Sequence, residues 1–233
     1  MHFKNFVLPI LAALLFASVS HADIVDPNRF VQIESVDFTT SVVQITNFDD
    51  TNTIDLDGWR FCTHDENEVR RYSGATGLNG FSLAPGESLF VHYDNDATAA
   101  NEVNINDLGG FFAEDLDVGP DPGGAYSIGL YWRSNFGFGD GDSLADHIQW
   151  SYDGVDNDSA DDRSDEAEGE VWLDQSDWIS ADSNTTRIDL NVANFDEEIH
   201  SSADYIVSVP EPASATLIGF GLAFAAMRRR RNS

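Results

Sequence analysis

The sequence predicts an all-β fold, an antiparallel sandwich or barrel, from its strand pattern and from its scarcity of helix signals. Short runs of β-branched and aromatic residues recur along the chain, each followed by Gly, Asn, Asp or Pro, which is typical of short strands joined by turns. In one run Leu89, Val91 and Tyr93 alternate with residues of the opposite side, as in a half-buried strand. No segment keeps the 3.6-residue period for three turns, so we expect little helix.

Eight strands are expected, in chain order. Their ranges are 30–38, 41–47, 54–62, 88–93, 125–133, 145–152, 187–192 and 204–209. The segment 47–52 is rich in Asn and Asp, whose side chains hydrogen-bond their own backbone, so it is expected to close a hairpin between the second and third strands. Pro85 and Gly86 predict a type II turn before the fourth strand.

The composition suits one globular domain with a strongly acidic surface. Of the 233 residues 42% are hydrophobic, too many for a disordered acidic tail. Between Asp23 and Pro212, seven Arg and no Lys stand against all 41 acidic residues, a balance of −34. Such a body repels phosphate backbones and anionic lipids, so nucleic acid and membrane surfaces are not expected partners. The carboxylates also fit a saline environment, in which they keep a secreted protein hydrated.

The N-terminus is typical of a secretory signal peptide over residues 1–22. Lys4 precedes an apolar run over 6–19, and Ser20 and Ala22 put small residues at positions minus 3 and minus 1 of a cleavage site. We therefore expect signal peptidase to cut between Ala22 and Asp23. An uncleaved membrane anchor would need about 20 apolar residues.

The C-terminal residues 210–233 form a tail of three parts. In order these are Pro210-Glu211-Pro212, an apolar run over 213–227, and the cluster Arg228-Arg229-Arg230-Arg231. A helix over the apolar run spans about 22 Å, short of the roughly 30 Å hydrocarbon core, and the Arg cluster holds its far end on the cytoplasmic side. This short transmembrane helix is expected to anchor the chain only transiently. The two Pro cannot continue the helix, so they leave an extended segment that a protease can read.

This tail resembles the PEP-CTERM sorting signal in the order and kind of its three parts. Such tails are recognised by exosortases, membrane cysteine proteases of Gram-negative bacteria that make exopolysaccharide. The resemblance implies export, transient membrane anchoring, and then release to the cell surface, to the extracellular matrix of a biofilm, or to the medium. Pro210, Glu211, Pro212 and the Arg cluster would serve recognition rather than chemistry.

The body between the two ends, residues 23–209, resembles the lamin-tail domain over about 32–152. Four segments carry the resemblance: 43–47, 54–61 with a Leu-x-Gly-Trp motif, 83–91 with Leu-x-Pro-Gly-Glu, and 142–150. It implies an immunoglobulin-like antiparallel β-sandwich, in which Trp59 is a large buried ring and Gly58 permits the bend before it. Residues 153–209 depart from that family, with an acidic loop and extra strands, and 171–179 is expected as an edge addition.

The chain contains no short motif of a catalytic or zinc site, and we expect no enzyme. Cys62 is the only cysteine, so it is expected to be buried and inert, or paired with another molecule. His64, His92, His147 and His200 lack zinc spacing; His92 and His147 lie in predicted strands and are expected to be packing or surface residues. Acidic pairs are too numerous for any one of them to indicate glycoside hydrolysis.

An acidic loop is the candidate metal site. Asp153, Asp156, Asp158, Asp161 and Asp162 carry the oxygen ligands that calcium prefers. The spacing does not meet the EF-hand pattern, because the sixth position lacks its Gly wherever Asp is placed at positions 1, 3 and 5. A solvated loop is the favoured interpretation, and calcium stays open as a cofactor.

Three functions follow from these patterns. The leading one is a non-catalytic adhesive or structural protein, exported through signal peptidase and exosortase, with exopolysaccharide or another surface protein as its partner. The second is a calcium-dependent carbohydrate-binding module in which Trp132, Trp150, Trp172 or Trp178 stacks on sugar rings, and the third is a secreted hydrolase. Exposure of the Trp rings separates the first two, because a buried ring belongs to the core.

Overall fold

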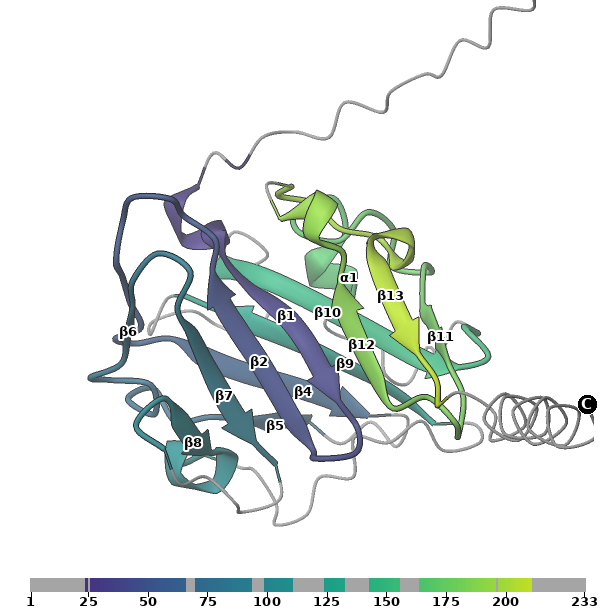
Figure 1. Ribbon diagram of the computed structural model, residues 1–233, viewed down its shortest axis with the longest axis horizontal. Helices are drawn as coiled ribbons and strands as arrows, with labels where there is room; N and C mark the ends of the chain where they lie inside the picture. Colours follow the sequence, from purple (N-terminus) through teal and green to yellow (C-terminus); the bar gives the residue numbers. More distant parts are fainter. Residues whose placement is uncertain are drawn as a thin grey trace, which may run out of the picture.

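Two β-sheets lie face to face and enclose the main hydrophobic core, as the all-β prediction requires (Figure 1). Neither sheet closes on itself, so within the described part of the chain the fold is a sandwich rather than a barrel. The one α-helix of that part is the single turn α1 (Ser164–Ala167). The structure, a computed structural model, describes residues 24, 26–65, 70–93, 99–110, 124–132, 143–155, 164–195 and 197–210.

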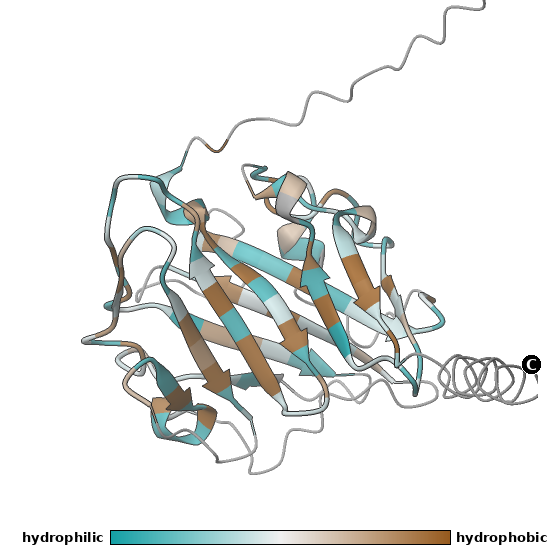
Figure 2. Cartoon of the chain, in the orientation of Figure 1, coloured by the Kyte–Doolittle hydropathy of each residue, from teal (hydrophilic) through white to brown (hydrophobic). Residues whose placement is uncertain are grey.

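Six strands form the sheet at the front of Figure 1. Their order is β13 (Tyr205–Ser208), β12 (Arg187–Leu190), β1 (Val31–Asp37), β2 (Val42–Asn47), β7 (Ser88–His92) and β8 (Glu102–Asn104). Polar and apolar residues alternate along β2 and β12, as Figure 2 shows, so each strand turns one face to the core and one to solvent.

Five strands form the second sheet, and a pair of two-residue strands stands apart. The order of the second sheet is β11 (Ile179–Ala181), β10 (Leu144–Tyr152), β9 (Ala125–Tyr131), β4 (Arg60–Asp65) and β5 (Arg70–Tyr72), and the separate pair is β3 (Ile54–Asp55) with β6 (Ser82–Leu83). The described ranges also contain short 3-10 helices: η1 (Pro27–Phe30), η2 (Ile105–Leu108), η5 (Val192–Asn194) and η6 (Ser202–Asp204).

The eight predicted strands are all found, with one of them divided. The predicted strand over 54–62 breaks at Gly58, so β3 ends at Asp55 and β4 begins at Arg60. The strands β5, β6, β8 and β11 were not predicted, because two or three residues are too few to show an alternating pattern.

The purely antiparallel prediction is wrong at one edge of each sheet. β8 pairs parallel to β7, and β11 pairs parallel to β10. A parallel pair needs a crossover connection rather than a tight turn. The connection 93–101 joins β7 to β8, and the connection 153–178 joins β10 to β11. Both are long because each leads to a parallel neighbour.

The segment 47–52 makes the predicted side-chain hydrogen bonds but not the predicted hairpin. Asp49 Oδ1 accepts from the amides of Thr51 and Asn52, at 2.7 and 2.8 Å. The strand before the segment, β2, pairs with β1 and β7, whereas the strand after it, β3, pairs with β6. The turn therefore carries the chain away from the six-stranded sheet.

The two turn predictions that used glycine are confirmed. Gly58 has φ +83°, which an L side chain rarely adopts, and the chain bends there so that Trp59 enters the core with 2% of its surface exposed. Gly86 has φ +73°, and the Glu87 amide donates to the Ala84 carbonyl at 2.9 Å, as a type II turn requires.

The C-terminal part of the chain does more than add an edge. β11 does lie at the edge of the five-stranded sheet, and it begins at Ile179. The residues before it cover the outer face of β10: Gln149 Nε2 donates to the carbonyls of Gln175 and Asp177, both at 2.8 Å, and His147 packs edge-on against the buried Trp172. As a result β10 is buried on both faces from Leu144 to Ser151.

Candidate functional site

The sorting tail leaves the domain at the end of its last strand. β13 ends at Ser208, and Pro210 follows two residues later, exposed to solvent. Glu211, Pro212, the apolar run and Arg228 to Arg231 lie outside the described residues, as do Ala22 and Asp23 at the expected signal cleavage site. No helix within the described ranges has the length and apolar character that crossing a membrane requires.

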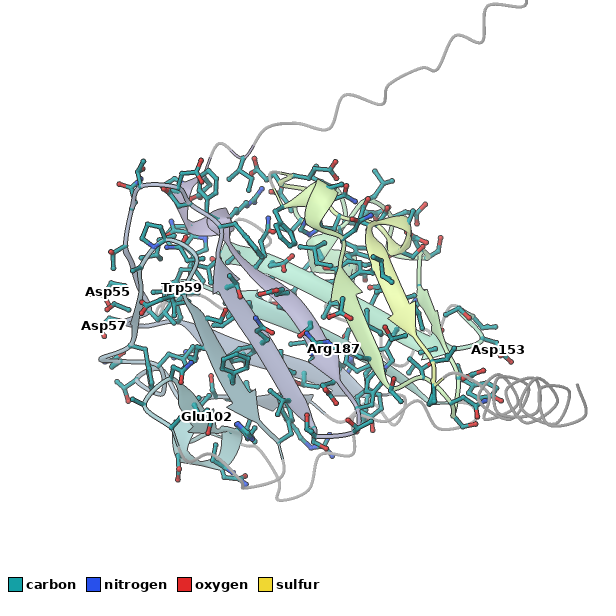
Figure 3. All side chains as sticks on the ribbon, viewed as in Figure 1. Asp55, Asp57, Trp59, Glu102, Asp153 and Arg187 are labelled. Atoms are coloured by element: carbon teal, nitrogen blue, oxygen red, sulfur yellow. The ribbon has the colours of Figure 1, made fainter. Side chains whose placement is uncertain are left out.

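The predicted calcium loop is described only at its start. Asp153 is exposed in a turn, with φ +63°, at the opposite end of the sandwich from Asp55 and Asp57 (Figure 3). Asp156, Asp158, Asp161 and Asp162 lie outside the described residues. Among the residues that are described, no three His, Cys, Asp or Glu side chains are grouped as a metal site.

Three of the four tryptophans that the carbohydrate-binding alternative would place against sugar rings are core residues. Trp150 and Trp172 are fully buried and Trp178 is 4% exposed, so the stacking prediction is wrong for these three rings. Trp132 is half-buried and packs against the main core. Cys62 is fully buried, as expected.

The two strand histidines also lie as expected. His147 is fully buried, whereas His92 is half-buried and faces Glu102 at 3.8 Å.

An open groove of about 1060 Å³, which the sequence did not reveal, lies on the outer face of the six-stranded sheet. Its floor crosses three neighbouring strands: Glu34 on β1, Gln44 and Thr46 on β2, and Ser88 on β7. Thr46 and Ser88 are direct partners in the strand register, so their side chains stand next to each other on the same face.

A β-bulge directs Glu34 into this floor. The register between β1 and β2 runs from Ile33 opposite Ile45 to Ser35 opposite Gln44, which leaves Glu34 as the extra residue. Bulges turn a side chain away from the regular alternation of a strand and are frequent beside functional sites. Here the carboxylate of Glu34 lies over β2.

The floor is a connected hydrogen-bond network. Glu34 Oε2 accepts from Gln44 Nε2 and from the Thr46 hydroxyl, both at 2.5 Å. The hydroxyls of Thr46 and Ser88 are 2.7 Å apart, and Gln44 Nε2 also donates to Ser88 at 3.1 Å. These contacts fix the four side chains in one arrangement before any ligand arrives.

Aromatic rings and a stiff acidic turn form the walls of the groove. The rings of Phe48 and Phe195 stack at 4.0 Å between centroids with 24° between their planes, and Phe30 lies beside them. Hydrogen bonds from the Asn52 side chain and from the Thr51 and Asn52 amides lower the pKa of Asp49 to about 2. The turn therefore stays charged and closed at neutral pH.

A second polar cluster is buried between the sheets. Asp146 on β10 accepts from the Ile33 amide at 2.6 Å through Oδ2, and from the His147 amide at 2.7 Å through Oδ1. His200 Nδ1 lies 3.3 Å from Oδ1, and both side chains are about 1% exposed. Burial lowers the pKa of His200, but the hydrogen bond to Asp146 and the charges of Asp146 and Asp204 outweigh it and leave the pKa raised. Asp146 and His200 are closed off from solvent, so a substrate does not reach them. Their hydrogen bonds join β1, β10 and the C-terminal segment.

The comparisons with known proteins agree with the tail. Residues 208–231 match the family model of the PEP-CTERM protein-sorting motif. No curated protein sequence matches the chain. The matched region begins on the last residue of β13 and contains Pro210, Glu211, Pro212 and the Arg cluster. The chain therefore carries a PEP-CTERM protein-sorting motif and is an exported substrate of exosortase.

Proposed function

We propose that the protein is a non-catalytic adhesive or structural component of the cell surface or of the exopolysaccharide matrix. The observation that carries the proposal is the sorting motif itself, which begins on the last strand of the sandwich. Exosortase processing close to Pro210 removes the apolar run and leaves the folded domain as the exported product.

Features of the sandwich support a role in contact rather than in catalysis. The buried Asp146 and His200 engage each other and the backbone, so they hold the fold. The described residues that line the groove include no His or Cys, and the carboxylate of Glu34 is held by hydrogen bonds from Gln44 and Thr46. A groove whose polar side chains are already held by one another suits recognition.

The experiment follows the native protein in producing cells with and without exosortase. With exosortase, intact-mass analysis should find surface or matrix material that lacks residues 1–22 and the Arg cluster. Without it, the chain should keep Arg228 to Arg231 and stay in the membrane fraction. Replacing the four terminal Arg with Gln should impair processing, whereas Arg187→Gln, a charge change within the domain, should not. Processed material inside the cell, or the same location in both strains, would contradict the proposal.

A further inference from the structure

We propose that the groove over β1, β2 and β7 binds a neutral, hydroxyl-rich glycan chain, without calcium. The inference rests on the proposed function, since it names the class of ligand that an adhesive matrix protein would bind. The site consists of the floor side chains Glu34, Gln44, Thr46 and Ser88 and of the wall rings Phe48 and Phe195.

The floor offers hydrogen-bond acceptors, and this decides what it can bind. Both donors that reach Glu34 use Oε2, which leaves Oε1 without a hydrogen bond among the described residues. The Thr46 hydroxyl donates to Glu34, so the Ser88 hydroxyl donates to Thr46 and keeps a lone pair for another donor. The matching ligand carries O–H donors, and a charged acceptor makes such bonds roughly twice as strong as neutral ones.

The walls match the other half of a sugar, its apolar C–H faces. Phe48 and Phe195 are half-buried, so each packs against the core with one part and borders the groove with another. Rings stacked at 4.0 Å make a continuous apolar surface that loses little side-chain entropy on binding, because stacking already holds it in place. Polar floor and aromatic wall meet along the loop that follows Asn47.

Charge restricts the ligand further. The charged residues that line the described groove are Glu34, Asp49 and Asp50, all acidic, with no Lys, Arg or His among its lining residues. An anionic polysaccharide or a phosphate would be repelled. Asp49 is already satisfied by hydrogen bonds from Thr51 and Asn52, so Glu34 and the exposed Asp50 are the acids with acceptor capacity to spare. Of these two, only Glu34 lies beside the hydroxyls of Thr46 and Ser88, and that combination of acceptors fits a polyol. A basic peptide would bind through the acidic charges alone, and the test below separates the two.

The groove and the sorting tail lie at opposite ends of the six-stranded sheet. Ser208 is level with Arg187, which is level with Asp37, which in turn is level with Val42. Thr46 lies four residues further along β2, roughly 14 Å from that row, and the groove continues into the loop after it. Before exosortase removes the tail, the groove is therefore already clear of the membrane anchor.

The test uses the purified exported protein and calorimetric titration in EDTA. The probes are hexasaccharides of glucose and mannose in several linkages, hexagalacturonate as the anionic control and hexalysine as the basic control. We expect a neutral hexasaccharide to bind and hexagalacturonate not to bind. Glu34→Gln and Phe195→Ala should each weaken binding about tenfold or more, with melting temperatures reported beside the affinities. Asp107→Asn is the matched control, because it removes one exposed charge in η2, outside the groove, and should leave affinity unchanged.

The outcomes separate the site from the proposed function. Binding of hexalysine alone would overturn the glycan and indicate a basic peptide. Binding that survives both groove variants would place the glycan elsewhere, and no binding by any neutral hexasaccharide would also overturn the inference. The fractionation of cells with and without exosortase does not depend on the groove, so a surface protein that binds no glycan refutes this inference alone.

Discussion

Two carboxylates, Glu34 and Asp146, lie next to the same β-bulge and have opposite surroundings. Asp146 is buried, and each of its oxygens accepts a hydrogen bond from a backbone amide. Glu34 is half-buried and lines the groove, and one of its oxygens takes both hydrogen bonds while the other takes none among the described residues. Ile33, whose amide binds Asp146, directly precedes Glu34 in the chain.

The contrast teaches how to distinguish a structural acid from one that can meet a ligand in a chain with 41 acidic residues. A carboxylate whose acceptor capacity is used by the fold can only stabilise it. A carboxylate that keeps a free oxygen beside a groove retains binding capacity, at a small cost to stability. Counting hydrogen bonds at each oxygen is therefore more informative here than counting acids.

Trp59→Ala should give the largest loss of stability among the variants, and the losses at Glu34 and Asp146 are compared with it. Removing this ring from the core should lower the free energy of unfolding by roughly 3–5 kcal/mol, because a cavity replaces it. Urea unfolding followed by circular dichroism gives the value. Leu173→Ala, at a side chain 62% exposed, is the control and should change stability by about 0.5 kcal/mol or less. Equal stability of Trp59→Ala and the parent would remove Trp59 from the core.

Asp146→Asn should come next, with a loss of roughly 3 kcal/mol, because a buried amide cannot accept from both backbone donors and from His200 at once. The same unfolding experiment measures it, with Asp107→Asn as the control of equal chemistry at an exposed site. A loss no larger than that of the control would show that the buried acid is not a structural one.

The same pair predicts a pH dependence of smaller size. His200 has a pKa raised above its ordinary 6.5 in the folded protein, so its protonated form stabilises the fold fully below pH 6.5. That contribution should be lost as the pH rises through the raised pKa. Melting temperatures measured across this range should fall in the parent and fall less in His200→Gln. If the melting temperature of the parent rises toward alkaline pH and that of His200→Gln does not, protonated His200 does not stabilise the fold.

Glu34→Gln should have the smallest effect on stability, about 0.5 kcal/mol or less, because the replacement amide oxygen still accepts from Gln44 or Thr46 at a half-buried site. Its melting temperature, read beside that of Asp146→Asn, tests the comparison directly. Similar losses in the two variants would erase the distinction between them.

Local pattern predicted the strands and turns, whereas the site depends on contacts between distant segments. Alternation gave β7 and the Leu-x-Gly-Trp motif gave the buried Trp59, because both signals lie within a few residues. The groove brings Glu34 to Ser88, and the buried pair brings Asp146 to His200, 54 residues apart. Neither the bulge at Glu34 nor the parallel pairing of β8 and β11 can be predicted from a local pattern in one sequence. The immunoglobulin-like and lamin-tail assignments stay predictions.

The position of β13 bears on the timing of export. β13 is the outermost strand of its sheet, paired to β12, and its last residue is where the sorting motif begins. An edge strand opens at lower free energy than a central one, because fewer contacts hold it. The last residues of β13 can therefore detach and reattach while the rest of the domain stays folded. The domain can therefore fold completely before exosortase cuts its tail, and the cut does not require the domain to unfold.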